Sequence, residues 1–405
     1  MVELKLTIMS RQSQDAENLE QLLEVFERRH HVHVRLHLLD WNTAWNEMLN
    51  SVFQQKGPDV SEIGTTWLGS LVGMDALSPL SHEETLVLGS PSAFVTSAWQ
   101  STTPRSLPMG YGETWAIPLW VDTRILYYRR DLLADAQGRW PPDDGERTAF
   151  ASHRLLVNTL DRLVESGVPV PLALPTHGSR MIIHHIASWI WGAGGRFLTE
   201  GGGRTLFQDP PALTGMCEYF GLERYLTDPA RGLDEAESDA LYAQGHAALT
   251  ISGAWLLTAA APEIVAQTRV VFPPGVPFVG GSHLVCWKHT RHRLLAVKLI
   301  QYLASAKVQA AWARQAGLLP TRLDVLSQPP FSNEPIYWLL ARGLQRGRSF
   351  PGVPLWGLVE ERLNEAYSDL WAEILSEPGL DLERTIAARL RPLARELDLT
   401  LSHRG

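Results

Sequence analysis

The chain has 405 residues, of which 45% are hydrophobic and 20% are charged, and its formal net charge is −8. That charge is spread without long runs, which argues against a nucleic-acid binder, because such a protein normally carries a basic patch. At roughly 150 residues per domain, the length predicts two or three domains in an ordinary globular chain.

The two cysteines, Cys217 and Cys286, form neither a metal-binding spacing nor a disulfide framework. A single bridge between them stays open, and two unpaired buried thiols are the preferred interpretation. No apolar run reaches the ~20 residues that a membrane helix needs, and the nearest candidate is His246–Pro262. We expect no export signal in this chain, because Met1–Met9 enters a strand-like pattern at once.

The N-terminal third alternates strand and helix patterns. The predicted elements are a strand at 4–9, a helix at 16–30, a strand at 32–39, a helix at 41–54 and a short strand within 57–64. This alternation predicts a parallel α/β sheet. Ligands of such sheets lie at the carboxyl ends of the strands, which here are the loops Ser10–Asp15, Leu39–Asn42 and Ile63–Leu68.

The stretch Ala116–Tyr128 reads as one strand whose alternate residues point to two faces. Trp120 and Asp122 share a face, opposite a row of apolar residues. A core has little use for that charge unless it finds a partner. A binding cleft has a use for both side chains.

Beyond this stretch, helical patterns dominate from about 148 to 258, with a glycine-rich interruption at 191–204. A loop rich in Pro and Gly at 272–285 precedes a clear helix at 292–305. The C-terminal part is predicted to be helical from about 356 onward.

Tryptophan is unusually frequent, with fifteen residues in the chain. Indole rings offer wide, half-apolar faces that suit either a core or a ligand. Several of them stand in loop-like or strand-end contexts: Trp41, Trp67, Trp120, Trp255 and Trp356.

Four stretches, in this order along the chain, share a pattern with one known family: Gly57–Leu80, Tyr111–Leu133, Gly245–Leu257 and Phe278–Arg322. Together they resemble the extracytoplasmic solute-binding proteins of sugar ABC transporters, the group that includes maltose- and trehalose-binding proteins. The resemblance implies a two-lobed periplasmic-binding-protein fold of class α/β, with hinge-connected lobes and a central ligand cleft. By the matches, the N-terminal lobe comprises 2–117 and 282–318, and the C-terminal lobe comprises 118–281 and 319–405.

The resemblance also implies binding residues. Asp122 corresponds to a sugar-binding carboxylate, which can accept hydrogen bonds from two hydroxyls; a hinge salt bridge with Arg124 is the alternative. Trp120, on the same face, either stacks on a pyranose ring or packs at the lobe interface. Trp255 corresponds to a stacking Trp that follows a Gly, with core packing as its alternative.

Further candidates are less specific. Trp41 and Trp67 follow the second and third strands, and each either stacks on the ligand or packs. Asp15 either binds a hydroxyl or caps the helix that begins at 16. The family often carries an acid just before the Trp of the third-strand loop, where Gly64 and Thr65 stand here, and this departure leaves the identity of the sugar open.

The remaining candidates come from the later part of the chain. Gly281 and Ser282 can present a backbone N–H and a hydroxyl to the ligand, or the glycine serves the hinge. Arg348 and Trp356 are predicted lid residues from the second lobe, although Arg348 is equally an exposed charge. His31 and His33 lie on a polar strand face, which is expected to be solvated, and neither a metal nor a cofactor is expected.

The function predicted from the sequence is the binding of a mono- or oligosaccharide outside the cytoplasm and its delivery to the permease subunits of an ABC importer. We expect a monomer with no catalytic activity and no nucleic-acid partner. One alternative is a glycoside hydrolase, although no recognisable pair of acids stands beside the tryptophans. The other is a binding protein for a polyamine, an iron complex or an oligopeptide.

Overall fold

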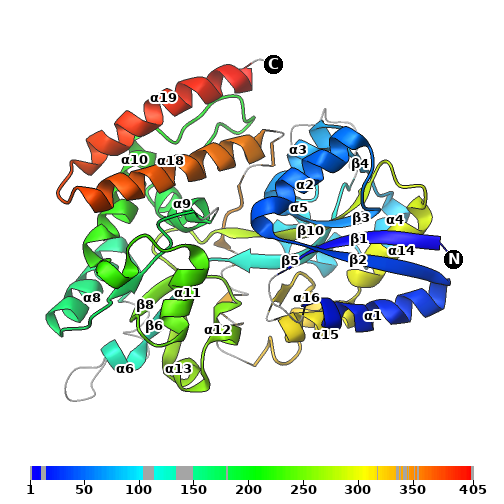
Figure 1. Cartoon of the computed structure of the whole chain (residues 1–405), viewed down its shortest axis with the longest axis horizontal. Helices are drawn as coiled ribbons and strands as arrows, with labels where there is room; N and C mark the ends of the chain where they lie inside the picture. The colour runs from blue at the N-terminus through cyan, green and yellow to red at the C-terminus, as the bar shows by residue number, and fades with distance from the viewer. Residues whose placement is uncertain are drawn as a thin grey trace. The chain divides into compact units, whose positions relative to one another are not determined.

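The computed structural model describes residues 2–10, 15–103, 114–133, 149–178, 181–316, 318–333, 337, 339–340, 344, 346–350, 352–353 and 355–402. The chain divides into two compact units, each with its own sheet and helices (Figure 1). Unit 1 comprises Met1–Asp122, Val279–Gln345 and Ser349–Gly357, and unit 2 comprises Thr123–Phe278, Arg346–Arg348 and Leu358–Gly405. The prediction of the α/β class is confirmed.

The sheet of unit 1 has the strand order β11-β5-β10-β3-β1-β2, and β4 pairs with β10. β1 is parallel to β2 and β3, whereas β10 is antiparallel to β3 and β11 is antiparallel to β5. The strands are β1 (Val2–Met9), β2 (Val32–Leu39), β3 (Val60–Gly64), β4 (Leu77–Ser78), β5 (Ile117–Thr123), β10 (Val279–Trp287) and β11 (Leu319–Pro320).

Ten helical segments accompany this sheet. They are α1 (Asp15–His30), α2 (Trp41–Gln54), η1 (Thr65–Trp67), α3 (Leu68–Gly73), α4 (His82–Leu86), η2 (Pro91–Ala93), α5 (Thr96–Gln100), α14 (Arg293–Leu303), α15 (Ala306–Ala316) and α16 (Leu323–Leu326), counted over the residues that the structure describes. The predicted order of strands and helices through residue 64 is confirmed. Leu19, Leu23 and Phe26 explain why α1 forms, because their helical spacing gives the helix one buried face.

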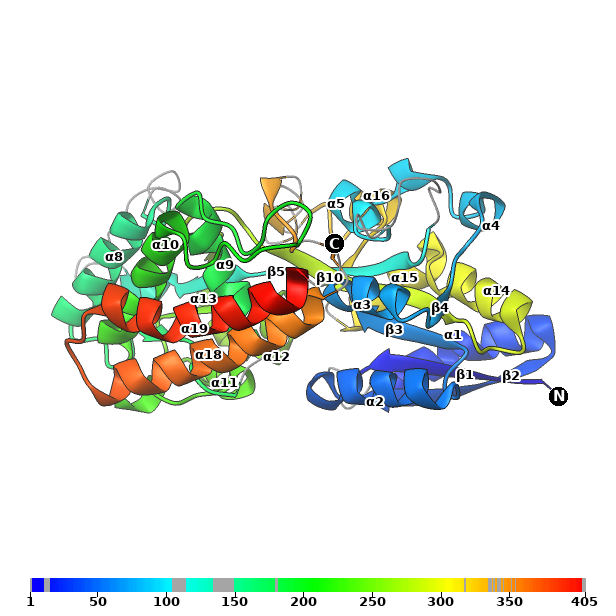
Figure 2. The same cartoon turned by 90° about the horizontal axis from the view of Figure 1, so that it is seen from above.

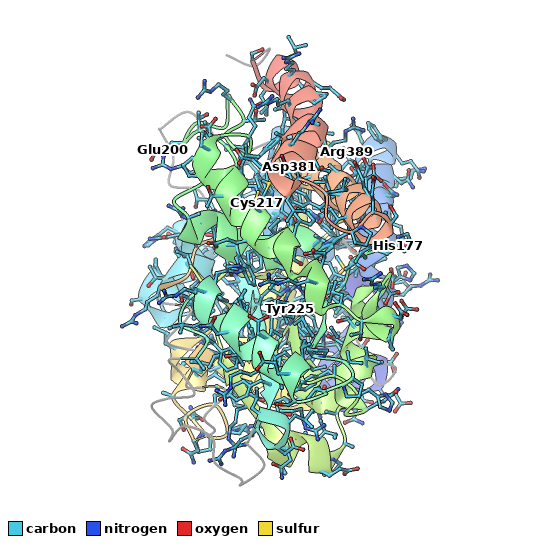
Figure 3. All side chains as sticks on the ribbon, turned by 90° about the vertical axis from the view of Figure 1, so that its left-hand side faces the viewer. His177, Glu200, Cys217, Tyr225, Asp381 and Arg389 are labelled. Atoms are coloured by element: carbon cyan, nitrogen blue, oxygen red, sulfur yellow. The ribbon has the colours of Figure 1, made fainter. Side chains whose placement is uncertain are left out.

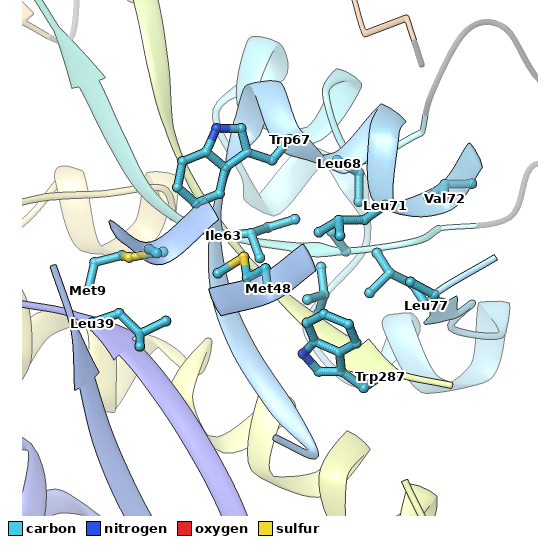
Figure 4. Close-up of a cluster of buried hydrophobic side chains, with 14 residues drawn as sticks. Met9, Leu39, Met48, Ile63, Trp67, Leu68, Leu71, Val72, Leu77 and Trp287 are labelled. Atoms are coloured by element: carbon cyan, nitrogen blue, oxygen red, sulfur yellow. The ribbon is translucent and has the colours of Figure 1, made fainter. Parts of the chain in front are cut away.

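A cluster of buried hydrophobic side chains in unit 1 includes the carboxyl ends of its parallel strands (Figure 4). Met9, Leu39 and Ile63 come from the ends of β1, β2 and β3, and Met48 reaches them from α2. Trp67 belongs to the same cluster and is only 8% exposed. The packing therefore gives the loops after β2 and β3 a rigid base.

Unit 2 contains a four-stranded sheet with the order β7-β8-β6-β9. Its strands are β6 (Ile125–Arg129), β7 (Leu172–Ala173), β8 (Leu249–Ser252) and β9 (Thr268–Val271). The helical segments described in unit 2 are α6 (Arg130–Leu133), α8 (His153–Glu165), α9 (Ile182–Gly192), α10 (Pro210–Phe220), η3 (Gly221–Tyr225), η4 (Asp228–Ala230), α11 (Glu235–Ala243), α12 (Leu256–Ala259), α13 (Pro262–Gln267), α18 (Trp356–Ser376, from Leu358 on) and α19 (Leu382–Ser402).

Helices α18 and α19 run side by side in unit 2, as both views show (Figures 1 and 2). Arg362 and Arg389 join them through ion pairs with Glu396 and Glu373, at N–O distances of 3.0 and 3.1 Å. These pairs are exposed, so their contribution to stability is small. The predicted helical C-terminal part is confirmed.

The stretch Ala116–Tyr128 differs from its prediction as one strand. It forms β5 and β6, which are separated by Arg124 and belong to different units. Residues 117–121 are all buried, so the expected contrast between a polar and an apolar face is absent there. The interior strands of such a sheet are covered on both faces, so their residues are apolar on both sides and the sequence does not alternate between apolar and polar residues.

The division into units also differs from the predicted lobes after residue 318. Residues 319–345 and 349–357 belong to unit 1, whereas the sequence predicted them in the C-terminal lobe. The reason is the pairing of β11 with β5, which joins Leu319 to Val121 and Pro320 to Trp120.

Both cysteines are free thiols, so the open alternative of a bridge does not hold. Cys286 is fully buried in β10, and Cys217 is half-buried on α10, near Asp381 (Figure 3). Burial, together with the carboxylates of Glu383 and Asp381, raises the pKa of the Cys217 thiol. That environment disfavours the reactive thiolate.

Among the described residues, no helix combines the length and the hydropathy that crossing a bilayer requires.

Candidate functional site

Three tryptophans gather at the carboxyl ends of β2 and β3, and we call them the tryptophan cluster of unit 1: Trp41, Trp45 and Trp67. The ring centroid of Trp67 lies 5.6 Å from that of Trp41 and 5.5 Å from that of Trp45. Trp41 and Trp45 stand one helical turn apart on α2, which brings them to the same face. Both are partly exposed above the buried Trp67, so the cluster offers an aromatic surface at the edge where α/β sheets bind ligands.

Trp41 and Trp67 were predicted from the sequence as candidates, whereas Trp45 was not. The spacing in "WNTAW" (41–45) was the available signal, because residues four apart on a helix are neighbours. Trp67 belongs to the core cluster, in line with its packing alternative, and contacts both exposed rings, while its role as a ligand contact stays a prediction.

A second aromatic group stands in unit 2 around Trp255, and we call Trp255, Asp239 and Arg124 the Trp255 group. Trp255 follows β8 at the start of α12 and is partly exposed. Its indole N–H donates to Asp239 Oδ2 at 2.9 Å. The guanidinium carbon of Arg124 lies 5.1 Å from the ring centroid, within the range of a cation–π contact.

Arg124 is fully buried, so its charge needs compensation within unit 2. Besides the Trp255 ring, it contacts the Phe278 ring at 5.9 Å and His184 Nδ1 at 3.3 Å. His184 stacks on Phe278 with centroids 4.3 Å apart, and its Nε2 meets Glu360 Oε1 at 3.0 Å. The Trp255 group therefore rests on a second layer of aromatic and polar contacts.

Asp122 is half-buried at the end of β5, the last residue of unit 1 before the chain enters unit 2. Gly281 has a positive φ of 135°, and a Cβ there would lie 2.0 Å from the carbonyl oxygen of Trp120. The close approach of β10 to β5 thus requires glycine. Both residues keep their predicted ligand roles as proposals.

Three other candidates, Trp120, Trp356 and Ser282, have buried side chains in this structure, and their roles as ligand contacts stay predictions. Trp120 is 2% exposed and meets Trp312 edge to face, at 4.8 Å between centroids. Trp356 is fully buried and stacks on Phe350 at 4.6 Å. Trp120 lies in a strand stretch that is buried throughout, and Trp356 lies on the buried side of a helix whose other side is exposed.

Ser282 is the third of these buried candidates. Its side chain is buried, and its hydroxyl donates to Glu62 in β3. Glu62 is itself fully buried and also accepts from the backbone N–H of Met9 at 2.9 Å. The hydroxyl is therefore committed to the sheet, where it compensates a buried carboxylate.

Arg348 is exposed and belongs to unit 2, as predicted for a residue of the second lobe. Its guanidinium lies 5.8 Å from the Trp191 ring, and its backbone pairs with Phe278. Asp15 begins α1, but its side chain lies outside the described part of the chain. The roles of both stay predictions.

His33 lies on the exposed face of β2, in line with the expected solvated strand face, whereas His31 precedes the strand with a φ of 53°. Over the described ranges, no group of three or more His, Cys, Asp or Glu side chains is arranged to hold a metal ion. The arrangements found in the two units suit binding, with aromatic faces for apolar ligand surfaces and a carboxylate for hydroxyls.

Solved structures share this fold along the whole chain. An ABC transporter solute-binding protein of Thermotoga lettingae, bound with alpha-D-tagatose, aligns at a TM-score of 0.81 and 19% identity over 99% of this chain and 100% of that one. The GacH receptor of Streptomyces glaucescens, also solved with acarbose, aligns at 0.79 and 20% identity over 98% of both chains. The sugar-binding protein MalE of Xanthomonas citri aligns at 0.78 and 20% identity, over 100% of this chain and 98% of that one. The predicted periplasmic-binding-protein fold is confirmed.

The fold is thus the one that these binding proteins share. The family described as bacterial extracellular solute-binding protein matches residues 21–337, and the chain belongs to that family. The diacetylchitobiose binding protein DasA of Streptomyces coelicolor is 21% identical over 379 residues, which cover 90% of this chain and 84% of that protein.

Proposed function

We propose that this protein binds a neutral mono- or oligosaccharide outside the cytoplasmic membrane and delivers it to the permease subunits of an ABC importer. The observation that carries the proposal is the partly exposed indole of Trp255, held at its edge by Asp239. The apolar face of a sugar ring packs well on such a surface. The ligands of these similar proteins, tagatose, acarbose and diacetylchitobiose, are carbohydrates.

The proposed ligand-contacting residues are assigned in each unit by itself. From unit 1 they are the tryptophan cluster, chiefly Trp41, with Asp122 as the acceptor for hydroxyls and Gly281 as a backbone donor. From unit 2 they are Trp255 and Arg348. A micromolar dissociation constant corresponds to about −8 kcal/mol, which two aromatic contacts and several charge-assisted hydrogen bonds supply.

Arg124 favours a neutral ligand over a polyamine. Its guanidinium lies 5.1 Å from the Trp255 ring and is fully buried, so its charge is poorly screened. A cation stacked on the same indole would be repelled. A neutral sugar avoids this cost, which supports carbohydrate over the polyamine alternative.

The protein acts without turnover in this proposal, as a monomer that carries its ligand. Family membership supports the binding role over the glycoside hydrolase alternative. Delivery requires that the ligand stabilise one conformation over another, because only differential affinity shifts such an equilibrium.

Calorimetric titration and thermal shift with tagatose, maltose, diacetylchitobiose and acarbose test the proposal, with spermidine and a tripeptide as comparison ligands. We expect saturable binding of at least one sugar, which chromatography then recovers unchanged. A thermal shift with spermidine or the peptide, and none with any sugar, would contradict the carbohydrate assignment. Cleavage of a sugar would contradict the absence of turnover.

A further inference from the structure

Asp239 contacts the edge of the candidate stacking ring although it stands sixteen residues earlier in the chain. It belongs to α11, whose start is fixed by a capping box between Asp234 and Glu237. The carboxylate is therefore presented from an anchored helix. It accepts the indole N–H of Trp255 at 2.9 Å, a distance typical of a well-formed hydrogen bond.

Two further contacts restrain the same ring. A Cβ at Gly253 would lie 2.0 Å from the six-membered part of the Trp255 indole, so the ring occupies the space that a side chain would need. The guanidinium carbon of Arg124 stands 5.1 Å from the ring centroid. Of these contacts, only the one to Asp239 is a hydrogen bond at the ring edge. This bond restrains the rotation of the indole about its Cβ–Cγ bond.

The surroundings of Asp239 suit a partner role. Burial raises the pKa of its carboxyl to about 6, while the Trp255 N–H and the charge of Arg124 oppose that rise. A carboxylate withdrawn from water is costly unless neighbouring groups compensate it. Here the compensating groups are the Ser252 side chain and the other two members of the Trp255 group.

We propose that Asp239 is a positioning residue that fixes the plane of the Trp255 indole before a ligand arrives, and that it thereby raises affinity without touching the ligand. Only the effect on affinity rests on the proposed function, because the fixed plane of the indole does not depend on any ligand. A side chain that is already ordered spares binding the entropy cost of fixing it, which corresponds to about a 2–12-fold change in affinity.

The first experiment needs no ligand. The protein is labelled with fluorotryptophan, and the Trp255 resonance is assigned by its loss in Trp255→Phe. We expect Asp239→Ala to shift and broaden this resonance, and Asp239→Asn, which keeps an acceptor oxygen, to preserve its line width. An unchanged Trp255 resonance in Asp239→Ala overturns the inference.

The matched control is Asp161→Ala. Asp161 also accepts a hydrogen bond from an aromatic side chain of unit 2, the Tyr225 hydroxyl, at 2.6 Å. Its removal tests whether any lost carboxylate–aromatic bond in unit 2 disturbs Trp255. An equal change of the Trp255 resonance in this control overturns the specific role of Asp239.

The second experiment measures affinity for tagatose, maltose, diacetylchitobiose and acarbose by calorimetry. For the sugar that binds, we expect about a 2–12-fold loss in Asp239→Ala, a smaller loss in Asp239→Asn and none in Asp161→Ala. Unchanged affinity in Asp239→Ala, where Trp255→Ala loses affinity, overturns the inference. Unchanged affinity in Trp255→Ala, or no binding of any of these four sugars to the parent protein, contradicts the proposed function instead, and the ligand-free spectrum still decides whether Asp239 holds the ring.

Discussion

The Ser282 hydroxyl donates a hydrogen bond to the Glu62 carboxylate, and this contact joins β10 to β3 inside unit 1. Both side chains are buried. Replacing Ser282 with Ala leaves the carboxylate with fewer donors, so we expect the free energy of unfolding to fall by about 1–3 kcal/mol. Urea unfolding followed by circular dichroism measures the change.

Ser332→Ala is the control for this prediction. Ser332 is exposed and its hydroxyl donates to the side chain of its neighbour Asn333, so removing that hydroxyl should change stability by at most about 0.5 kcal/mol. If Ser282→Ala kept full stability and instead lost sugar affinity, Ser282 would be a ligand contact after all.

Gly281→Ala is expected to destabilise unit 1. Its positive φ of 135° and the 2.0 Å approach of a Cβ to the Trp120 carbonyl oxygen both oppose a side chain. Strain and overpacking together cost about 2–5 kcal/mol. Gly201→Ala is the matched control, because a Cβ there meets nothing within 4 Å. Equal melting temperatures for the two variants would show that β5 and β10 can separate freely at this point.

Trp41 and Trp67 are expected to respond differently to replacement by Ala. Trp41 is partly exposed, so its loss should reduce sugar affinity by about 10-fold, with a smaller effect on stability. Trp67 is 8% exposed within the core cluster, so its loss should cost about 3–5 kcal/mol of unfolding free energy. Calorimetry with the sugar and urea unfolding measure the two effects, and the reverse order would assign the ligand face to Trp67.

The N-terminal elements were predictable because their patterns are strong and local. Helix α1 shows apolar residues at helical spacing, and β2 alternates buried and exposed residues, so each period is visible in the sequence. The stretch Ala116–Tyr128 lacks such a contrast, because residues 117–121 are buried on both faces. Its break at Arg124 depends on the boundary between units, which no local pattern encodes.

The candidate site was only partly predictable from the sequence, for a physical reason. An indole suits a core as well as a ligand, so the pattern could not separate Trp356, which is buried, from Trp255, which is partly exposed. Asp239 was missed because its contact with Trp255 arises from the packing of α11 beside β8, not from proximity in the sequence. Trp45 was predictable, because it stands four residues after Trp41 on the same helix.

The last prediction concerns pH and the Asp239 carboxyl. Burial raises its pKa from 3.8 to about 6, with Asp234 acting in the same direction and Arg124 against it. The folded state therefore prefers the neutral carboxyl. The stability that this preference contributes is fully present below the unfolded pKa of 3.8 and is lost as the pH rises through about 6.

We therefore expect the melting temperature of the parent protein, relative to Asp239→Asn, to fall between about pH 4 and pH 6.5 and to stay level above that range. A difference of about 2–6 °C is the expected scale. In the Trp255→Phe background the transition should move to higher pH, because the indole N–H no longer stabilises the ionised carboxylate. A constant difference across this range would mean that Asp239 titrates in the folded protein as it does in the unfolded chain.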